Sequence, residues 1–251
     1  MKHLKTRLNR IGRNLIIAMS IGDGCIAKAG YLSINHSEAQ KEYCEWKWRL
    51  LKKNGVPVGT FRKKIGMNGY SKGKSVTQYT FQSSVLDFCK VLRRIEYDLG
   101  KGKYNRKLLN RIGAQGLAIW IMDDGSLLRR TKHDKNTGEK KYCGFYITIS
   151  TYCDSETADN IIKYFKEEWN ICPTKVFDKR ANSYIISFCA REGRKLINII
   201  KPYMCPYMMY KVIPNKTECD KYMNMLKNSG EIPDDGTLNK EEMGNTEMVK
   251  I

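Results

Sequence analysis

Two stretches of the chain combine an unbroken apolar run with an acidic residue and a glycine at its end. Residues 15–24 read Leu-Ile-Ile-Ala-Met-Ser-Ile-Gly-Asp-Gly, and residues 117–125 read Leu-Ala-Ile-Trp-Ile-Met-Asp-Asp-Gly. Each run is too short to span a membrane and predicts a buried helix that stops at the acidic–glycine pair. Asp23 and Asp124 therefore stand at matching places, 101 residues apart.

The segments after the two runs repeat the same order of periodicities. Alternation of apolar and polar residues predicts strands, and helical spacing of apolar residues such as Tyr43, Trp46 and Leu50 predicts helices. The predicted elements span residues 31–35, 38–53, 56–58, 76–81 and 85–92 after the first run, and 145–150, 154–169, 172–176, 183–188 and 193–200 after the second. Each half is expected to be helix, two strands, helix, two strands, helix, so the fold class is α+β with one unit used twice.

The repeat, the local composition and the charge together divide the chain into two halves, a linker and a tail. We assign residues 1–98 to the N-terminal half, the Lys- and Gly-rich residues 99–107 to a linker, and residues 108–228 to the C-terminal half. Residues 229–251 carry a net charge of −4 and form a polar acidic tail that we expect to be disordered. The whole chain carries +19, so the body without the tail carries +23. Only the second half inserts a basic hairpin tip, at residues 129–141.

The composition excludes several classes of protein. An excess of 45 Lys and Arg over 26 Asp and Glu indicates a polyanionic partner, and the absence of an apolar run near the roughly 18 residues of a membrane span argues against insertion in a membrane. Nine cysteines without a Cys-x-x-Cys pair, and three dispersed histidines, argue against a disulfide framework or a zinc site. We expect an intracellular reducing compartment, either a bacterial or phage-host cytoplasm or an organelle matrix, and no secretion.

The paired acids are the strongest candidates for chemistry. A carboxylate at a helix C-terminus is disfavoured by the helix dipole, so a purely structural role does not explain why Asp23 and Asp124 both occupy such ends. A divalent cation held between two such carboxylates and a phosphate would offset that cost. Hard oxygen ligands of this kind suit metal-assisted hydrolysis of a phosphodiester.

These residues resemble a known family. Residues 20–24 and 117–125, together with the segment 200–211 (Ile-Lys-Pro-Tyr-Met-Cys-Pro-Tyr-Met-Met-Tyr-Lys), are similar to the LAGLIDADG homing endonucleases of the single-chain, two-motif branch. The resemblance covers about residues 10–215 and implies two pseudo-symmetric αββαββα halves. In that fold the LAGLIDADG helices pack at the centre, beside two DNA-binding antiparallel sheets.

The resemblance also implies roles for individual residues. Asp23 and Asp124 match the catalytic, metal-binding carboxylates, with Gly22 and Asp123 just before them. A basic residue is implied in each half to polarise the attacking water or the scissile phosphate. Lys211 matches the second of these, whereas Lys101 and Lys103 both remain candidates for the first because the proline expected nearby is absent.

The contact between the two motif helices requires small residues. Ala18 and Gly22 supply them in the first helix. The matching places in the second are Ile119 and Asp123, with Ala114 and Ala118 as an alternative small face.

The polar positions of the strands are the candidates for DNA recognition, because a sheet lying in the major groove reads base edges. The candidate groove-facing residues are Lys28, Ser33, Asn35, Arg62, Lys64, Gln78, Thr80, Gln82, Lys175, Lys179, Arg180 and Ser187. The candidate phosphate contacts are Lys52, Lys53, Lys63, Arg129, Arg130, Lys140 and Lys141. An ordinary solvated sheet face remains the alternative for any one of them.

The sequence thus predicts a monomeric, site-specific double-strand DNA endonuclease that uses Mg²⁺ or Mn²⁺, has no obligate protein partner and binds about 20 base pairs. A chain that begins with Met, without a splicing nucleophile or a His-Asn end, is expected to be a free-standing endonuclease rather than an excised intein. The main alternative is a maturase that binds intron RNA on the same fold. A transcription regulator is a further alternative, but it would need an additional DNA-binding domain.

Overall fold

The computed structural model describes residues 8–66, 75–98, 104–133, 135 and 137–229. The first half consists of α1 (Arg10–Ile21), β1 (Cys25–Ile26), β2 (Leu32–Ser37), the 3₁₀ turn η1 (Glu38–Gln40), α2 (Lys41–Lys53), β3 (Arg62–Gly66), β4 (Val76–Gln82), α3 (Asp87–Arg93) and the π-helical turn η2 (Arg94–Asp98). The second half consists of α4 (Arg106–Asp124), β5 (Gly125–His133), β6 (Lys140–Cys153), α5 (Ser155–Trp169), β7 (Thr174–Asp178), β8 (Ser183–Cys189) and α6 (Ala190–Ile200). The short helices η3 (Lys201–Tyr203) and η4 (Pro206–Lys211) and the helix α7 (Lys216–Ser229) follow.

Two four-stranded antiparallel sheets have the same topology. Their strand orders are β1-β2-β4-β3 and β5-β6-β8-β7, so in each half the strand that comes last in the sequence lies inside the sheet. Along β2 the buried positions Leu32, Ile34 and His36 alternate with more exposed ones, so one face of the sheet is covered by helices and the other is open. The predicted α+β fold class, with one unit used twice, is confirmed.

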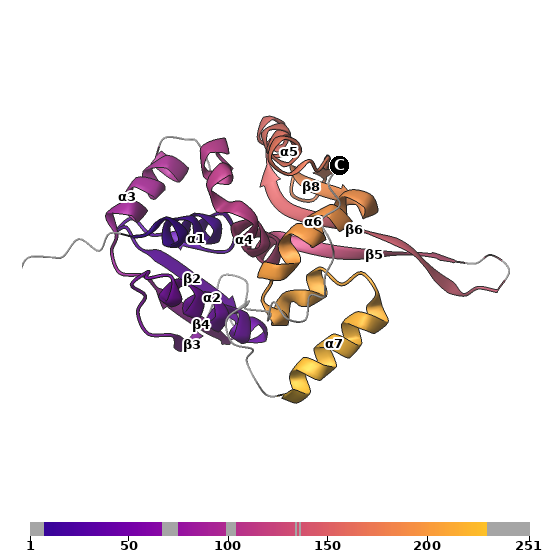
Figure 1. Ribbon diagram of the computed structural model, residues 1–251, viewed down its shortest axis with the longest axis horizontal. Helices are drawn as coiled ribbons and strands as arrows, with labels where there is room; N and C mark the ends of the chain where they lie inside the picture. Colours follow the sequence, from indigo (N-terminus) through magenta and orange to yellow (C-terminus); the bar gives the residue numbers. More distant parts are fainter. Residues whose placement is uncertain (1–7, 67–74, 99–103, 134, 136, 230–251) are drawn as a thin grey trace, which may run out of the picture.

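The helices α1 and α4 lie side by side between the two sheets (Figure 1). Asn9 caps α1 by accepting a hydrogen bond from the Gly12 N–H at 2.7 Å, and Asn105 caps α4 by accepting one from the Lys107 N–H at 3.0 Å. The two helices approach closely where Gly116 faces Ala18, because a Cβ on Gly116 would lie 2.9 Å from the Ala18 Cβ. The small face of α4 is therefore made by Gly116, a residue that the sequence analysis did not select.

One predicted strand is wrong. Residues 56–58 form a loop in which only Val58 makes an isolated bridge, to Ser83, and the strand lies instead at Arg62–Gly66. The segment is apolar because Val56 is buried beside Gly12. The Val56 N–H also donates a hydrogen bond to the Leu51 carbonyl in the last turn of α2. The edge strand β3 gives no alternation because it is exposed along most of its length.

The helix α7 was not predicted from the sequence; it is anchored by the buried side chains of Cys219 and Leu226. In the second half, the strands β5 and β6 extend the predicted basic tip into a long hairpin with a bulge between Arg130 and Thr131 (Figure 1).

Residues 99–103 of the predicted linker and 230–251 of the acidic tail lie outside the described residues. No helix among those the structure describes is long and apolar enough to cross a membrane.

Candidate active site at the ends of the paired helices

Both motif helices end in the same way. Gly24 donates its N–H to the Met19 carbonyl at 2.8 Å, and a Cβ on Gly24 would collide with that same carbonyl oxygen. A Cβ on Gly125 would collide with the Ile121 carbonyl oxygen at the end of α4. The glycine of each pair is thus required by the close approach of the chain to the last helical turn, which places the preceding acids, Asp23 and Asp124, at equivalent ends of α1 and α4.

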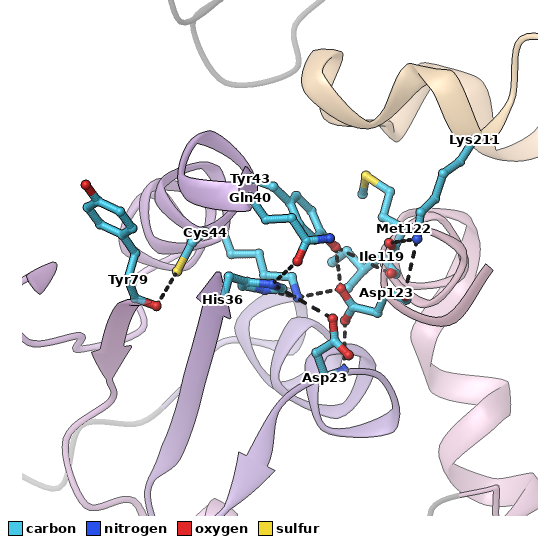
Figure 2. A network of polar contacts seen from close by, with 11 residues as sticks. Asp23, His36, Gln40, Tyr43, Cys44, Tyr79, Ile119, Met122, Asp123 and Lys211 are labelled. Atoms are coloured by element: carbon cyan, nitrogen blue, oxygen red, sulfur yellow. Dashed lines mark hydrogen bonds and ion pairs between the residues drawn. The ribbon is translucent and has the colours of Figure 1, made fainter. Parts of the chain in front are cut away.

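Asp123 is the centre of a buried polar network (Figure 2). Its side chain has no exposed surface, and its Oδ1 accepts hydrogen bonds from the Tyr43 hydroxyl at 2.7 Å and from the Lys47 ammonium at 2.6 Å. Its Oδ2 accepts one from the Asp23 N–H at 3.1 Å. The carboxylate of Asp123, in the second motif, therefore holds the backbone N–H of Asp23, the catalytic candidate in the first motif.

Gly22 is required by this packing. The nearest atoms to a Cβ at this position all belong to Asp123, including its Cβ and Cγ at 2.7 Å. Because those atoms lie near the backbone of Asp123 and its carboxylate is held by Lys47 and Tyr43, the side chain cannot move aside. Gly22 and Asp123, which the sequence analysis placed just before the metal-binding acids, are thus opposite each other in the helix contact.

His36 extends the network toward Asp23. Its Nε2 lies 3.1 Å from the Lys47 ammonium, its Nδ1 lies 3.0 Å from the Gln40 Oε1, and Nδ1 is 3.9 Å from the Asp23 Oδ2. Because an ammonium can only donate, Nε2 accepts, and the ring is neutral with its proton on Nδ1. Burial, reinforced by the Lys47 charge, lowers the pKa of His36 to about 4, in agreement with a neutral ring.

Ligand atoms of Asp23, His36 and Asp123 lie within 4.8 Å of one another, close enough for a metal ion. The Lys47 ammonium, however, already neutralises Asp123 and bonds the accepting nitrogen of His36. Asp23 differs, since 38% of its side chain is exposed, and Asp124 is half-buried at the end of α4. Asp23 is therefore more accessible than Asp123, whose side chain has no exposed surface.

Lys211 joins the site from outside the repeated unit. Its ammonium donates hydrogen bonds to the carbonyl oxygens of Met122 and Asp123, at 2.5 and 3.2 Å, and so satisfies the last turn of α4. Burial lowers the pKa of Lys211, and the nearby charges of Asp123, Asp23 and Asp124 oppose that shift. Lys101 and Lys103, the two candidates for the first half, lie outside the described residues.

The groove-facing candidates of the first half share one face. The register pairs Ser33 with Gln82, Asn35 with Thr80, and Lys64 with Gln78, and residues paired across strands point to the same side. Arg62 is opposite Thr80 on that side. Ser33, Asn35, Arg62, Lys64, Thr80 and Gln82 line a hollow of about 560 Å³ on the open face of the sheet. Lys28 is exposed in the turn between β1 and β2.

The candidates of the second half divide between the two faces. Ser187 and Arg130 lie on the open face, and Lys179 and Arg180 are exposed in the turn between β7 and β8. Arg129 and Lys175 instead face the helices. The Arg129 guanidinium donates to the carbonyl oxygens of Ile213 and Pro214, both at 2.8 Å, and the Lys175 ammonium bonds Ser155 and Asp159 of α5. These two side chains therefore do not belong to the open face of the second sheet.

The remaining basic candidates lie at the periphery. Lys52 and Lys53 are exposed at the end of α2, Lys63 is exposed on β3, Lys141 is exposed near the start of β6, and Lys140 is the first residue of β6. The Lys52 ammonium stacks over the Trp48 ring at 4.9 Å.

Lys47, His36 and the polar role of Tyr43 were not predicted from the sequence. The signal that could have found them is a lysine within the apolar stripe of α2, where Tyr43, Trp46 and Leu50 are all buried. A lysine at such a position requires an anionic partner. The partner, Asp123, lies 76 residues further along the chain, so only the fold identifies it.

Comparison with known proteins agrees with this arrangement. The sequence profile of the LAGLIDADG DNA endonuclease family matches residues 13–196. A probable intron-encoded DNA endonuclease 3 of Mycosarcoma maydis is 33% identical over 112 residues, which cover 43% of this chain and 69% of that protein. RecA of Mycobacterium gastri is 25% identical over 209 residues, or 80% of this chain and 46% of that protein. The chain thus spans less than half the length of the RecA proteins that it matches.

Among solved structures, the homing endonuclease I-WcaI bound to its DNA recognition sequence superposes with a TM-score of 0.67 at 23% identity, over 84% of this chain and 89% of that one. This likeness concerns the fold. The family profile covers most of the two repeated halves and both acidic–glycine motifs. The chain belongs to the LAGLIDADG DNA endonuclease family.

Proposed function

We propose that this protein is a site-specific endonuclease that hydrolyses both strands of a duplex. The observation that carries the proposal is the placement of Asp23 and Asp124 at equivalent ends of two packed helices, between two sheets with open faces. Family membership supports DNA as the substrate and favours the nuclease over the intron-RNA maturase. Each sheet would follow one turn of the major groove, so the two together would cover about 20 base pairs.

Asp23 and Asp124 are the residues that would hold a divalent cation, Mg²⁺ or Mn²⁺. The donor set fits such an ion, because carboxylates are hard oxygen ligands and the exposed side chain of Asp23 is open to a phosphate. A bound divalent ion would activate water and stabilise the charge on the phosphate oxygens. Asp123 contributes differently. Its buried carboxylate accepts a hydrogen bond from the backbone N–H of Asp23 and so fixes the position of the Asp23 backbone.

Lys211 would supply a fixed positive charge to the second half of the site. Its two hydrogen bonds to the carbonyl oxygens at the end of α4 hold the ammonium close to Asp124, where it can stabilise a developing negative charge on the phosphate. Lys101 or Lys103 would serve the first half in the same way. One nearby lysine and one carboxylate would then act in each half, so that each half cuts one strand.

The test is cleavage of a duplex target by the wild-type protein and by Asp124→Asn and Asp23→Asn. A target is first recovered from a pool of randomised duplexes by sequencing the molecules that the protein cuts in Mg²⁺, and is then cloned into a plasmid. We expect each variant to lose double-strand cutting by roughly 100-fold or more, as expected when one group that stabilises transition-state charge is removed. Binding of the same duplex, measured in EDTA, should remain.

Asp220→Asn is the matched control, because Asp220 is an exposed acid on α7, outside the site. It should cut at the wild-type rate. Double-strand cutting by Asp124→Asn at the control rate would contradict the proposed role of Asp124. Failure of the wild-type protein to enrich or cut any duplex in the presence of Mg²⁺ or Mn²⁺ would contradict the proposed function itself.

A further inference from the structure

The open faces of the two sheets have different chemistry. On the first sheet, the rows that the register brings onto the open face of β2, β4 and β3 carry hydrogen-bonding or charged side chains, except the last row, in which Gly66 pairs with Val76. The pairs are Ser33 with Gln82, Asn35 with Thr80, Arg62 with Thr80, and Lys64 with Gln78. A face of this kind can donate to and accept from base edges throughout the major groove.

On the second sheet, the open face alternates between apolar and hydroxyl-bearing rows. Leu128 pairs with Tyr146, which pairs in turn with Cys189, and at the other end Val176 pairs with Ile185. Between these rows, hydroxyl groups run across all four strands through Ser126, Thr148, Ser187 and Thr174. The residues next to Leu128 in the chain face the helices, which places Leu128 itself outward.

The apolar side chains of this face are open to solvent. Leu128 is 41% exposed and Val176 is 45% exposed, and Ile185 beside Val176 is half-buried. Neither Leu nor Val can form a hydrogen bond, so each would leave an unpaired donor or acceptor if it covered the polar edge of a base. An apolar base feature is therefore required opposite them.

Basic groups surround these rows and identify the occupant as a polyanion. The Arg130 guanidinium stacks over the Tyr146 ring on the same face, 5.5 Å from its centroid. Lys179 and Arg180 are exposed in the turn that joins β7 to β8, three and four residues after Val176 and just beyond Asp178, and Lys132 is exposed further along the hairpin. This charge favours a nucleic acid over an apolar protein partner for the same surface.

We propose that the apolar rows of the second sheet, formed by Leu128, Val176 and Ile185, recognise the 5-methyl groups of thymine in one half of the DNA target. The methyl of thymine is the apolar group that an unmodified base pair presents in the major groove. The first sheet would read its half by hydrogen bonds, so the two halves of the target are recognised by different chemistry. This inference rests on the proposed function, since it assumes that the open faces bind duplex DNA.

The experiment replaces thymine by deoxyuridine in one half of the target at a time. This change removes the methyl group and leaves base pairing and the O4 acceptor intact. Targets are selected by binding from a pool of randomised duplexes, and affinities are measured in EDTA with the wild-type chain. We expect deoxyuridine to weaken binding in one half only, by roughly fourfold per methyl group in contact, as for exposing one buried methylene.

Two variants assign that half to the second sheet. Val176→Thr and Leu128→Thr keep a strand-compatible side chain on an exposed position and should therefore fold. Each should reduce the deoxyuridine sensitivity of the affected half. Gln78→Thr, on the open face of the first sheet, is the matched control and should leave the sensitivity as it is in the wild-type chain.

The outcomes separate this inference from the proposed function. Selected duplexes that bind tightly but tolerate deoxyuridine in both halves would overturn the inference and leave the endonuclease intact. Deoxyuridine sensitivity that Val176→Thr and Leu128→Thr do not change would also overturn it. If no duplex is retained, the proposed function fails and the inference fails with it.

Discussion

The two halves share one topology but differ in what they bury. In the first half, the helix α2 buries Tyr43 and Lys47, and both reach the carboxylate of Asp123 at the end of α4. In the second half, the buried residues of the corresponding helix α5 are Ala158, Ile161, Tyr164 and Phe165, none of which is ionic. The cation of that side, Lys211, comes from the short helix η4 after the repeated unit.

This difference teaches that a repeated fold does not require a repeated site. The two motif acids occupy equivalent helix ends, yet the backbone of Asp23 is held by Asp123, whereas the carbonyl groups next to Asp124 are held by Lys211. The two sheets also differ, because the open face of the first is polar in all but its last row, Gly66 with Val76, whereas the open face of the second carries Leu128 and Val176. Each half can therefore be tested against the other.

The largest effect on stability is expected from Lys47→Met. The Lys47 and Asp123 side chains are fully buried, and removal of the cation leaves the carboxylate without compensation. We expect the free energy of unfolding to fall by about 3–5 kcal/mol. Chemical denaturation measures it. Adding Asp123→Asn to Lys47→Met removes the isolated charge and should restore part of the lost stability.

For the other half, the loss of stability caused by Lys211→Met is compared with that of Lys47→Met. The Lys211 ammonium bonds backbone carbonyls near the open side of the site, so the loss should be smaller, about 1–2 kcal/mol. Lys52→Met, at an exposed position of α2, should change stability by no more than about 0.5 kcal/mol. Equal losses for Lys47→Met and Lys211→Met would refute the view that the buried ion pair from α2 stabilises the protein more than the Lys211 hydrogen bonds from η4 do.

Gly22→Ala is expected to have a smaller effect than Lys47→Met. The new Cβ would press on the Cβ and Cγ of Asp123, which the Lys47–Tyr43 network holds in place. We expect a loss of about 1–3 kcal/mol in the free energy of unfolding, together with weaker cutting, because α1 and α4 must separate. Gly66→Ala is the control in the same half, since a Cβ there meets no atom within 4 Å. A Gly22→Ala variant as stable as Gly66→Ala would show that the helix contact adapts freely.

The smallest effect, on the salt dependence of duplex binding, is expected from single arginines. One lies on the open face of the first sheet and the other on the helix-covered face of the second. Arg62→Gln removes a charge from the open face of the first sheet, so the slope of log affinity against log salt should fall by about 0.9. Arg129→Gln removes a guanidinium that bonds Ile213 and Pro214, so it should lower stability and leave the slope unchanged. Salt titration of duplex binding measures both. An equal decrease in the slope of log affinity against log salt in both variants would show that Arg129 contacts the DNA.

Much of the fold could be predicted because it depends on local pattern. The apolar runs before Asp23 and Asp124, the alternation in the strands and the repeated order of elements predict an α+β unit used twice, and the structure confirms it. The strand at Arg62–Gly66 escaped prediction because an exposed edge strand has no alternation to detect. The helix α7 was also missed, since its buried residues include only Cys219 and Leu226.

By itself, the sequence determined the repeated architecture, the basic character of the body and the two acids at the helix ends. Each of these follows from residues close together in the chain or from totals over it. Only the tertiary structure decided that Lys47 and Tyr43 hold Asp123, that Gly116 makes the small face of α4, and that Arg129 and Lys175 turn toward the helices. These contacts join different elements, often across dozens of residues, and their stability depends on burial and close approach, which a linear pattern does not contain.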